Sequence, residues 1–163
     1  MGEIKTTGRK AKAHVDEKLA MSMPSRQLLE SLAVECASNP SLDNTFQYAF
    51  ALCKSDSPSE LRYAVTILDG LIKEYKHQVD CMYGAATALY LLGKYDEARS
   101  RCEAILRSKP DMRDVAELHA ACIVSMEDEQ DAKIKEAAVK GTIGVAAVGI
   151  ALGIAGMLLS KRR

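Results

Sequence analysis

The sequence predicts an all-α protein in which six consecutive helices contain two repeats and are followed by a single C-terminal transmembrane helix. Three observations support this prediction. Apolar residues recur at helical spacing from residue 25 onward, a helix–turn–helix pattern repeats after 34 residues, and twenty uncharged residues stand near the C-terminus. No segment of comparable length shows the alternation of apolar and polar residues that is typical of a β-strand.

Six segments carry apolar residues at the i, i+4, i+7 spacing of one helix face. They cover residues 25–39, 42–53, 58–75, 79–92, 95–109 and 111–123. The best-defined start is at Ser57, because Ser57-Pro58-Ser59-Glu60 has the pattern of a capping box with proline at the first helical position. Pro40 and Pro110 mark helix ends, because the residue before a proline is driven away from the helical conformation.

The middle four helices form two repeats. A shift of 34 residues places Ala64 on Ala98, and this helix–turn–helix period is that of tetratricopeptide repeats. The unit 79–112 has the fuller pattern, whereas the unit 45–78 lacks the turn glycine and the closing proline. The residues that we expect to pack the repeats are Ala64, Gly93, Tyr95, Ala98 and Pro110. The sequence therefore predicts a six-helix tetratricopeptide-like bundle whose outer helices cap the two repeats.

Residues 141–160 contain no charged side chain and are followed by Lys161, Arg162 and Arg163. A helix of this length spans about 30 Å, the thickness of the hydrocarbon core of a bilayer. We therefore expect a transmembrane tail anchor at 141–160, a basic targeting end at 161–163, and residues 1–140 in the cytosol. Gly149 and Gly153 offer a small-residue packing face for a homo-oligomer. Alternatively, the glycines only lower the hydrophobicity of the anchor.

Composition excludes several classes of function. The chain has 163 residues with 22 basic and 22 acidic side chains, so nucleic acid is not an expected partner. Residues 1–24 carry five basic and three acidic side chains, and we expect a flexible basic arm there, then a helical domain at 25–127 and a juxtamembrane helix or linker at 128–140. The five cysteines form no CxxC pair and have no histidine at metal-ligand spacing, so we expect buried thiols and neither metal nor cofactor.

The first helix of each repeat should line the concave face of the bundle. Helical spacing on this face gives a partner-binding groove of Ala49, Cys53, Tyr83, Thr87 and Tyr90. The tyrosines suit an amphipathic helix or an extended segment with apolar anchors, although either tyrosine would alternatively pack inside between the repeats. Residues 79–93 contain no lysine, arginine or asparagine, which argues against a clamp for the carboxylates of chaperone C-termini.

Three segments resemble the mitochondrial fission 1 protein family. They are FQYAFALCKS at 46–55, LRYAVTIL at 61–68 and YLLGKYDEA at 90–98, and their order matches that family. The resemblance covers residues 25–163. It implies an adaptor in the mitochondrial outer membrane, and also on peroxisomes, that recruits dynamin-related GTPases or their adaptor proteins for membrane division. It also implies that the N-terminal arm can lie across the groove and regulate the access of partners.

Two other functions fit the same features. A repeat domain on the same membrane would also serve as a receptor for precursor proteins or chaperones. An oligomerised anchor would remodel the membrane directly, in which case activity would depend on Gly149 and Gly153. The sequence contains no phosphate-binding loop, no nucleophile elbow and no HExxH motif, so we do not expect an enzyme.

Overall fold

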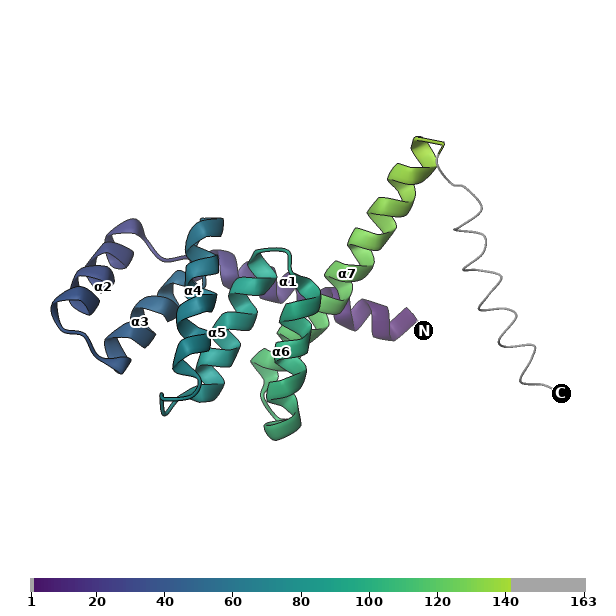
Figure 1. The fold of residues 1–163 in the computed structure, drawn as a ribbon. Coiled ribbons are helices and arrows are strands. Elements are labelled where there is room, and N and C mark those ends of the chain that lie inside the picture. Colours follow the sequence, from purple (N-terminus) through teal and green to yellow (C-terminus); the bar gives the residue numbers. More distant parts are fainter. Residues whose placement is uncertain (1, 142–163) are drawn as a thin grey trace. The chain divides into compact units, whose positions relative to one another are not determined.

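The structure, a computed structural model, describes residues 2–141, and it describes side chains from residue 5 onward. The described residues form seven α-helices and no strand, which confirms the predicted all-α class (Figure 1). The helices are α1 (Gly2–Met21), α2 (Arg26–Ser38), α3 (Leu42–Leu52), α4 (Pro58–Leu71), α5 (Gln78–Leu91), α6 (Tyr95–Ser108) and α7 (Arg113–Val139). The chain divides into two compact units, Met1–Met126 and Glu127–Arg163, and α7 runs from the first into the second.

Helices α2 and α3 begin where the sequence supplies a capping hydroxyl group. Ser25 Oγ accepts a hydrogen bond from the N–H of Leu28, and Ser41 Oγ accepts one from the N–H of Asn44, both at 3.1 Å. Each bond satisfies one of the amide groups that have no partner within the first turn of a helix. The starts of these helices are therefore encoded locally.

Helix α4 begins at Pro58 as predicted, but the capping box of Ser57 and Glu60 does not form. The side chain of Ser57 makes no hydrogen bond to the first turn of the helix. Glu60 instead accepts a hydrogen bond from the Ser55 hydroxyl and two from the guanidinium group of Arg26, at 2.8 and 2.7 Å. Glu60 therefore ties the start of α2 to the start of α4, because the arginine competes successfully for its carboxylate.

The two repeats are α3–α4 and α5–α6, and the turn in the second repeat depends on glycine. Gly93 has a φ of +74°, a left-handed conformation that side chains with a Cβ atom disfavour. Its N–H donates to the carbonyl of Tyr90 at 3.0 Å, and the N–H of Lys94 donates to the carbonyl of Leu89 at 2.9 Å. These two bonds form a Schellman motif, which ends α5 and turns the chain into α6.

Two clusters of buried side chains form the core, and α5 contributes to both. The first cluster joins α1, α5, α6 and α7 and consists of Val15, Leu19, Ala86, Leu89, Tyr90, Ala98, Cys102, Ile105, Val115, Leu118, Ala121 and Cys122. The second joins α2, α3, α4 and α5 and consists of Leu29, Ala49, Leu52, Cys53, Leu61, Ala64, Leu68, Leu71, Tyr75, Cys81, Ala85 and Ala88. Eight of the fourteen residues of α5 are buried, so this helix is packed on most of its sides.

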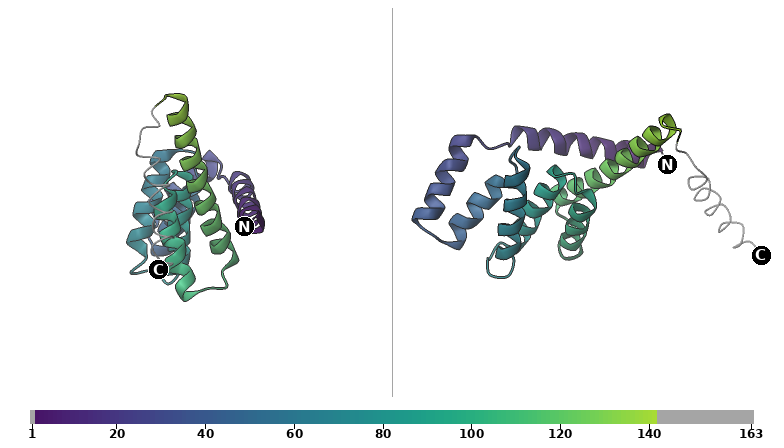
Figure 2. Two further views of the ribbon diagram at one scale, coloured as in Figure 1. Left: turned by 90° about the vertical axis from the view of Figure 1, so that its right-hand side faces the viewer. Right: turned by 45° about the horizontal axis from the view of Figure 1, so that its top comes forward.

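The flexible arm predicted for residues 1–24 differs from what the structure shows. Residues Gly2–Met21 form α1, so the described residues contain seven helices instead of the six predicted. The physical reason is a stripe of small and apolar residues at helical spacing, which includes Gly8, Val15 and Leu19 and packs against the rest of the fold. Figure 2 (right) shows α1, in purple, lying across the other helices between α2 and α7.

The C-terminal part of the described chain is helical. Helix α7 continues to Val139, so most of the segment 128–140, predicted as a juxtamembrane helix or linker, is helical. The predicted anchor from residue 142 on, including Gly149 and Gly153, lies outside the described residues, as does the basic end 161–163. None of the helices in the described part of the chain is long and apolar enough to cross a bilayer.

Candidate functional site: a helix-binding surface on α5 and α7

The N-terminal helix α1 covers part of α5 and α7. Val15 and Leu19 are 6% and 9% exposed, and they are buried with Tyr90 of α5 and Cys122 of α7 in the first core cluster. The helices approach closely at Gly8, where an added Cβ atom would lie 3.1 Å from the side chain of Val124. One face of α1 is thus fitted to the helices beneath it.

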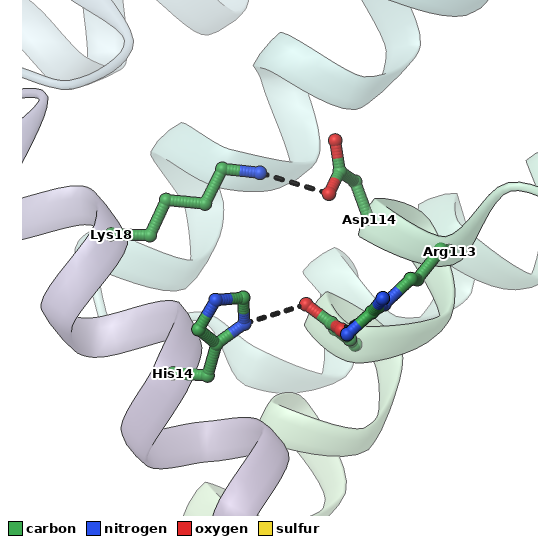
Figure 3. Close-up of polar contacts among 5 residues, drawn as sticks. His14, Lys18, Arg113 and Asp114 are labelled. Atoms are coloured by element: carbon green, nitrogen blue, oxygen red, sulfur yellow. Dashed lines mark hydrogen bonds and ion pairs between the residues drawn. The ribbon is translucent and has the colours of Figure 1, made fainter.

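Two polar contacts join one flank of α1 to the start of α7 (Figure 3). Lys18 Nζ donates to Asp114 Oδ1 at 2.9 Å, and His14 Nδ1 lies 2.8 Å from Glu117 Oε2. Arg113 Nε donates to the other carboxylate oxygen of Glu117, also at 2.8 Å. The hydrogen bonds from Arg113 and then from His14 hold the pKa of Glu117 below its ordinary value, and the bond to Asp114 raises the pKa of Lys18. Glu117 therefore presents a negative charge to α1 at neutral pH.

The other flank of α1 contacts α5 through Asp16. The hydroxyl of Tyr90 donates to Asp16 Oδ1 at 2.6 Å, while Lys12 Nζ donates to Asp16 Oδ2 at 2.7 Å. Burial raises the pKa of Tyr90, and the hydrogen bond to Asp16 raises it further, so Tyr90 stays protonated and acts as a donor. The ring of Tyr90 lies 5.3 Å from that of Tyr95, which extends the contact to α6.

We call the area of α5 and α7 beneath α1 the α1-binding surface and define it by Tyr83, Tyr90, Asp114 and Glu117. Tyr83 is half-buried, packs against the first core cluster, and lies close enough to Lys18 for the two groups to influence each other electrostatically. The two tyrosines supply apolar area and the two carboxylates supply negative charge. This combination binds a basic amphipathic helix, and α1 is such a helix.

The structure places the predicted groove residues in two different environments. Tyr83 and Tyr90 belong to the α1-binding surface, and Thr87 is buried beneath it with its hydroxyl donated to the carbonyl of Tyr83 at 2.9 Å. Ala49 and Cys53 are fully buried in the second core cluster, and Thr87 is only 1% exposed, so the prediction that these three residues line an open groove is wrong.

The error on α3 is one of helical rotation. The α3 residues that border open space beside α2 are Phe46, Gln47, Phe50 and Ala51, with Lys54 just beyond the end of the helix. One residue along an α-helix corresponds to a rotation of about 100°. The open face of α3 is therefore centred about 130° around the helix from Ala49.

Of the five residues predicted to pack the repeats, two lie in the interior. Ala64 and Ala98 are fully buried, Tyr95 is half-buried against the ring of Tyr90, and Gly93 forms the turn described above. Pro110 is exposed in the connection between α6 and α7. The close approach of helices that alanine permits thus occurs in both repeats.

Sequence reasoning missed the residues of α1 that make this site. The spacing of Gly8, Val15 and Leu19 was a usable signal, because it predicts one apolar face of a helix. The partners of His14 and Lys18 could not be found in this way, since they lie 103 and 96 residues further along the chain.

Comparison with known proteins identifies the family. The sequence model described as tetratricopeptide repeat matches residues 61–122. A mitochondrial fission 1 protein of Yarrowia lipolytica is 32% identical over 133 residues, which cover 76% of this chain and 76% of that protein. The one of Tuber borchii is 31% identical over 126 residues, which cover 72% of this chain and 74% of that protein. This chain belongs to the mitochondrial fission 1 protein family.

Solved structures from the mitochondrial fission 1 family show the same fold. The crystal structure of Fis1 from Saccharomyces cerevisiae has a TM-score of 0.64 at 23% identity and covers 71% of this chain and 95% of that one. Yeast Fis1 in complex with an Mdv1 fragment has a TM-score of 0.63 at 24% identity, and the match covers 69% of this chain and 94% of that one. The family resemblance inferred from the sequence is thus confirmed, and the helical arrangement is that of the family.

Proposed function

We propose that this chain is a non-enzymatic adaptor in mitochondrial fission, and that a helical segment of a dynamin-related GTPase or of its adaptor protein docks on the α1-binding surface. The observation that carries this proposal is that the surface already holds an amphipathic helix, α1. It does so through the buried side chains of Val15 and Leu19, an ion pair of Lys18 with Asp114 and a hydrogen bond of His14 with Glu117. A surface that accepts one such helix accepts another with the same spacing of apolar side chains.

The contact with α1 is small enough to be displaced. Among the described side chains of α1, only Val15 and Leu19 are buried. The side chains of Lys18 and Asp114, which form an ion pair, are 46% and 56% exposed. Exposed ion pairs contribute about 0.2–1 kcal/mol to stability. A partner helix that binds more tightly than this would take the place of α1, so α1 regulates the access of partners.

Family membership supports the role in fission, and a relative supports the kind of partner. Yeast Fis1 has been solved with a fragment of Mdv1 that contains an N-terminal extension and a coiled coil. We extend this mode of binding, in which a fission 1 protein holds a segment of another protein, to the present chain. The uncharged residues 141–160 would anchor it in the mitochondrial outer membrane and in peroxisomes, with the helical domain in the cytosol.

Partner binding is tested with the full-length chain and with a variant that lacks residues 2–24. We expect the shortened chain to bind the dynamin-related GTPase or its adaptor several-fold more tightly, because no helix competes for the surface. In the shortened chain Tyr83→Ala should weaken binding about ten-fold, whereas Tyr63→Ala, at an exposed site on α4, should leave it unchanged. Equal affinity of the Tyr83→Ala and parent proteins would remove the α1-binding surface from the proposal.

Membrane attachment is tested by imaging fluorescent fusions of the full-length chain and of a chain truncated before residue 141. The full-length protein should sit on mitochondria and restore their division in cells that lack it. The truncated protein should be diffuse and inactive. Extraction of the full-length protein from organelles by alkaline carbonate would contradict the anchor.

A receptor for precursor proteins is a second candidate, because α1 shares the chemistry of mitochondrial targeting sequences. Those sequences are basic amphipathic helices, and the α1-binding surface pairs such a helix with Asp114 and Glu117. Pulldown with synthetic targeting peptides on the chain lacking residues 2–24 separates the two functions. Selective retention of these peptides together with normal mitochondrial division in cells that lack the protein would favour the receptor.

A further inference from the structure

An open apolar recess lies beside the last turn of α1. Its volume is about 450 Å³, and it is lined by the end of α1, the connection at 22–25, α2 and α3. Met21, Met23 and Leu28 line it and are 81%, 51% and 47% exposed, while Phe46 and Phe50 of α3 are half-buried at its floor. We call this site the α2–α3 recess. Large apolar side chains that gather around a hollow and remain exposed mark a binding site for another molecule.

The recess continues the contact that α1 makes with the rest of the fold. Leu19 is buried in the first core cluster, and two residues later Met21 forms a wall of the recess. Helix α1 ends there, because the chain turns through Pro24 into α2. The first helices of the two repeats therefore differ in what they contact. Helix α5 is covered by α1, whereas α3 borders open space.

Charge indicates what kind of molecule fits. Lys54 is the one charged side chain that lines the recess, and its ammonium group lies 5.1 Å from the centre of the Phe50 ring. None of the ion pairs in the described part of the chain includes Lys54, whereas Lys18 on the α1-binding surface is paired with Asp114. Lys54 as a whole is half-buried, and an ammonium group beside apolar walls gains most from a carboxylate brought by a ligand.

We propose that the α2–α3 recess binds an acidic amphipathic segment of a partner protein, whose apolar side chains contact Met21, Met23 and Phe46 and whose carboxylate pairs with Lys54. This inference rests on the adaptor function proposed above and adds a second contact to it, one that is used while α1 stays in place. The two methionines suit this role, because their flexible and polarisable side chains adapt to partners of different shape.

The test uses full-length protein in phosphatidylcholine nanodiscs and two labelled synthetic peptides. One peptide is a helix of about 14 residues with leucines at i, i+3, i+4 and i+7 and glutamates on the flanks, and the other has lysine in place of each glutamate. We expect the acidic peptide to bind at least ten-fold more tightly than the basic one. Lys54→Glu should reverse this preference, and Met21→Gln should weaken the acidic peptide several-fold.

Lys73→Glu is the matched control, because Lys73 is exposed, lies outside the recess and changes the net charge by the same amount. It should leave both affinities within two-fold of the parent values. Equal binding of the two peptides, or a Lys54→Glu protein that keeps the original preference, would overturn the proposal. If the peptides behave as expected but cells lacking the protein divide their mitochondria normally, the recess stands and the adaptor function fails. If Lys54→Glu has no effect while the protein still supports division, only the recess fails.

Discussion

The carboxylate of Glu117 contacts side chains of two helices, Arg113 of α7 and His14 of α1, whereas the contact described for Asp114 is with Lys18 of α1. Arg113, on the same helix as Glu117, fixes one carboxylate oxygen and leaves the other 2.8 Å from His14. Because the bond from Arg113 does not depend on α1, Glu117 is already held by its own helix and loses little rotamer freedom when α1 docks. The pair of Lys18 with Asp114 is more exposed and has no such support.

Lys18→Glu should loosen α1 without unfolding the domain. The new carboxylate would face Asp114 and Glu117, which replaces an attraction by a repulsion at a solvent-exposed site. We expect docking to weaken by about 1 kcal/mol, which raises the undocked population about five-fold. Hydrogen exchange of the α1 amides measures this change. The control is Lys10→Glu on the exposed side of the same helix, which should behave like the parent protein. Equal protection of α1 in the two variants would contradict the role of the Lys18 pair.

Acid should release α1 through Glu117. The hydrogen bond from Arg113 lowers the pKa of Glu117 whether or not α1 is docked, whereas the smaller lowering by His14 of α1 exists only in the docked state. Through the His14 contact, ionised Glu117 stabilises the docked state at pH values above its ordinary pKa of 4.5. This contribution is lost as the pH falls through the lowered pKa. Methyl NMR signals of Val15 and Leu19 should therefore shift toward undocked values between about pH 5 and 3, with the buried Leu68 as an internal reference for global folding. In Glu117→Gln the docked population should start lower and change less over the same range. If the parent protein and Glu117→Gln respond identically to pH, the release of α1 by acid is caused by carboxylates other than Glu117.

At the level of helices, the contact of α5 with α3 and α4 depends on a missing side chain. A Cβ atom added at Gly84 would lie 2.9 Å from Leu68 Cδ1 and 3.0 Å from Phe50 Cδ2. Gly70 of α4 has no atom within 4 Å of the corresponding position. Substitution of alanine at Gly84 tests both helix packing and helix propensity, whereas the same substitution at Gly70 tests helix propensity alone. The two glycines therefore form a matched pair.

Gly84→Ala should destabilise the domain, and Gly70→Ala should stabilise it. The first forces Leu68 or Phe50 to move and should cost about 1–2 kcal/mol. The second removes only the conformational freedom of glycine in the unfolded chain and should gain about 0.5–1 kcal/mol. Urea unfolding followed by circular dichroism measures both free energies. Stabilisation by Gly84→Ala would show that the helices can separate at no cost.

The helices α2 to α7 could be predicted from the sequence, because each carries its own apolar face and several start at a serine or after a proline. The repeat was visible for the same reason, since Ala64 and Ala98 recur at the required distance. Two features could not be predicted. The rotation of α3 that buries Ala49 is set by packing against α4, and the docking of α1 is set by Asp114 and Glu117, far away in the sequence. Local patterns carry no information on such distant pairs.

For the molecule as a whole, α1 is an addition to a fold that is complete without it. The second core cluster contains no residue of α1, and only two of the twelve residues of the first cluster come from it. Removal of residues 2–24 should therefore leave α2 to α7 folded, with a cooperative thermal transition at a slightly lower temperature. Binding of an apolar fluorescent dye should increase, because Tyr83 and Tyr90 become exposed. Loss of cooperative unfolding would show instead that α1 is a part of the core.

One surface serving both an internal helix and an outside protein places two demands on the same side chains. A mutation at Asp114 that improves binding of a partner also alters the fit of Lys18, so neither property can evolve alone. Across species, the charge at the position of Lys18 should therefore change in step with the charge at the position of Asp114. Lineages in which the N-terminal helix has been lost should be free of this constraint and should vary most at Asp114 and Glu117.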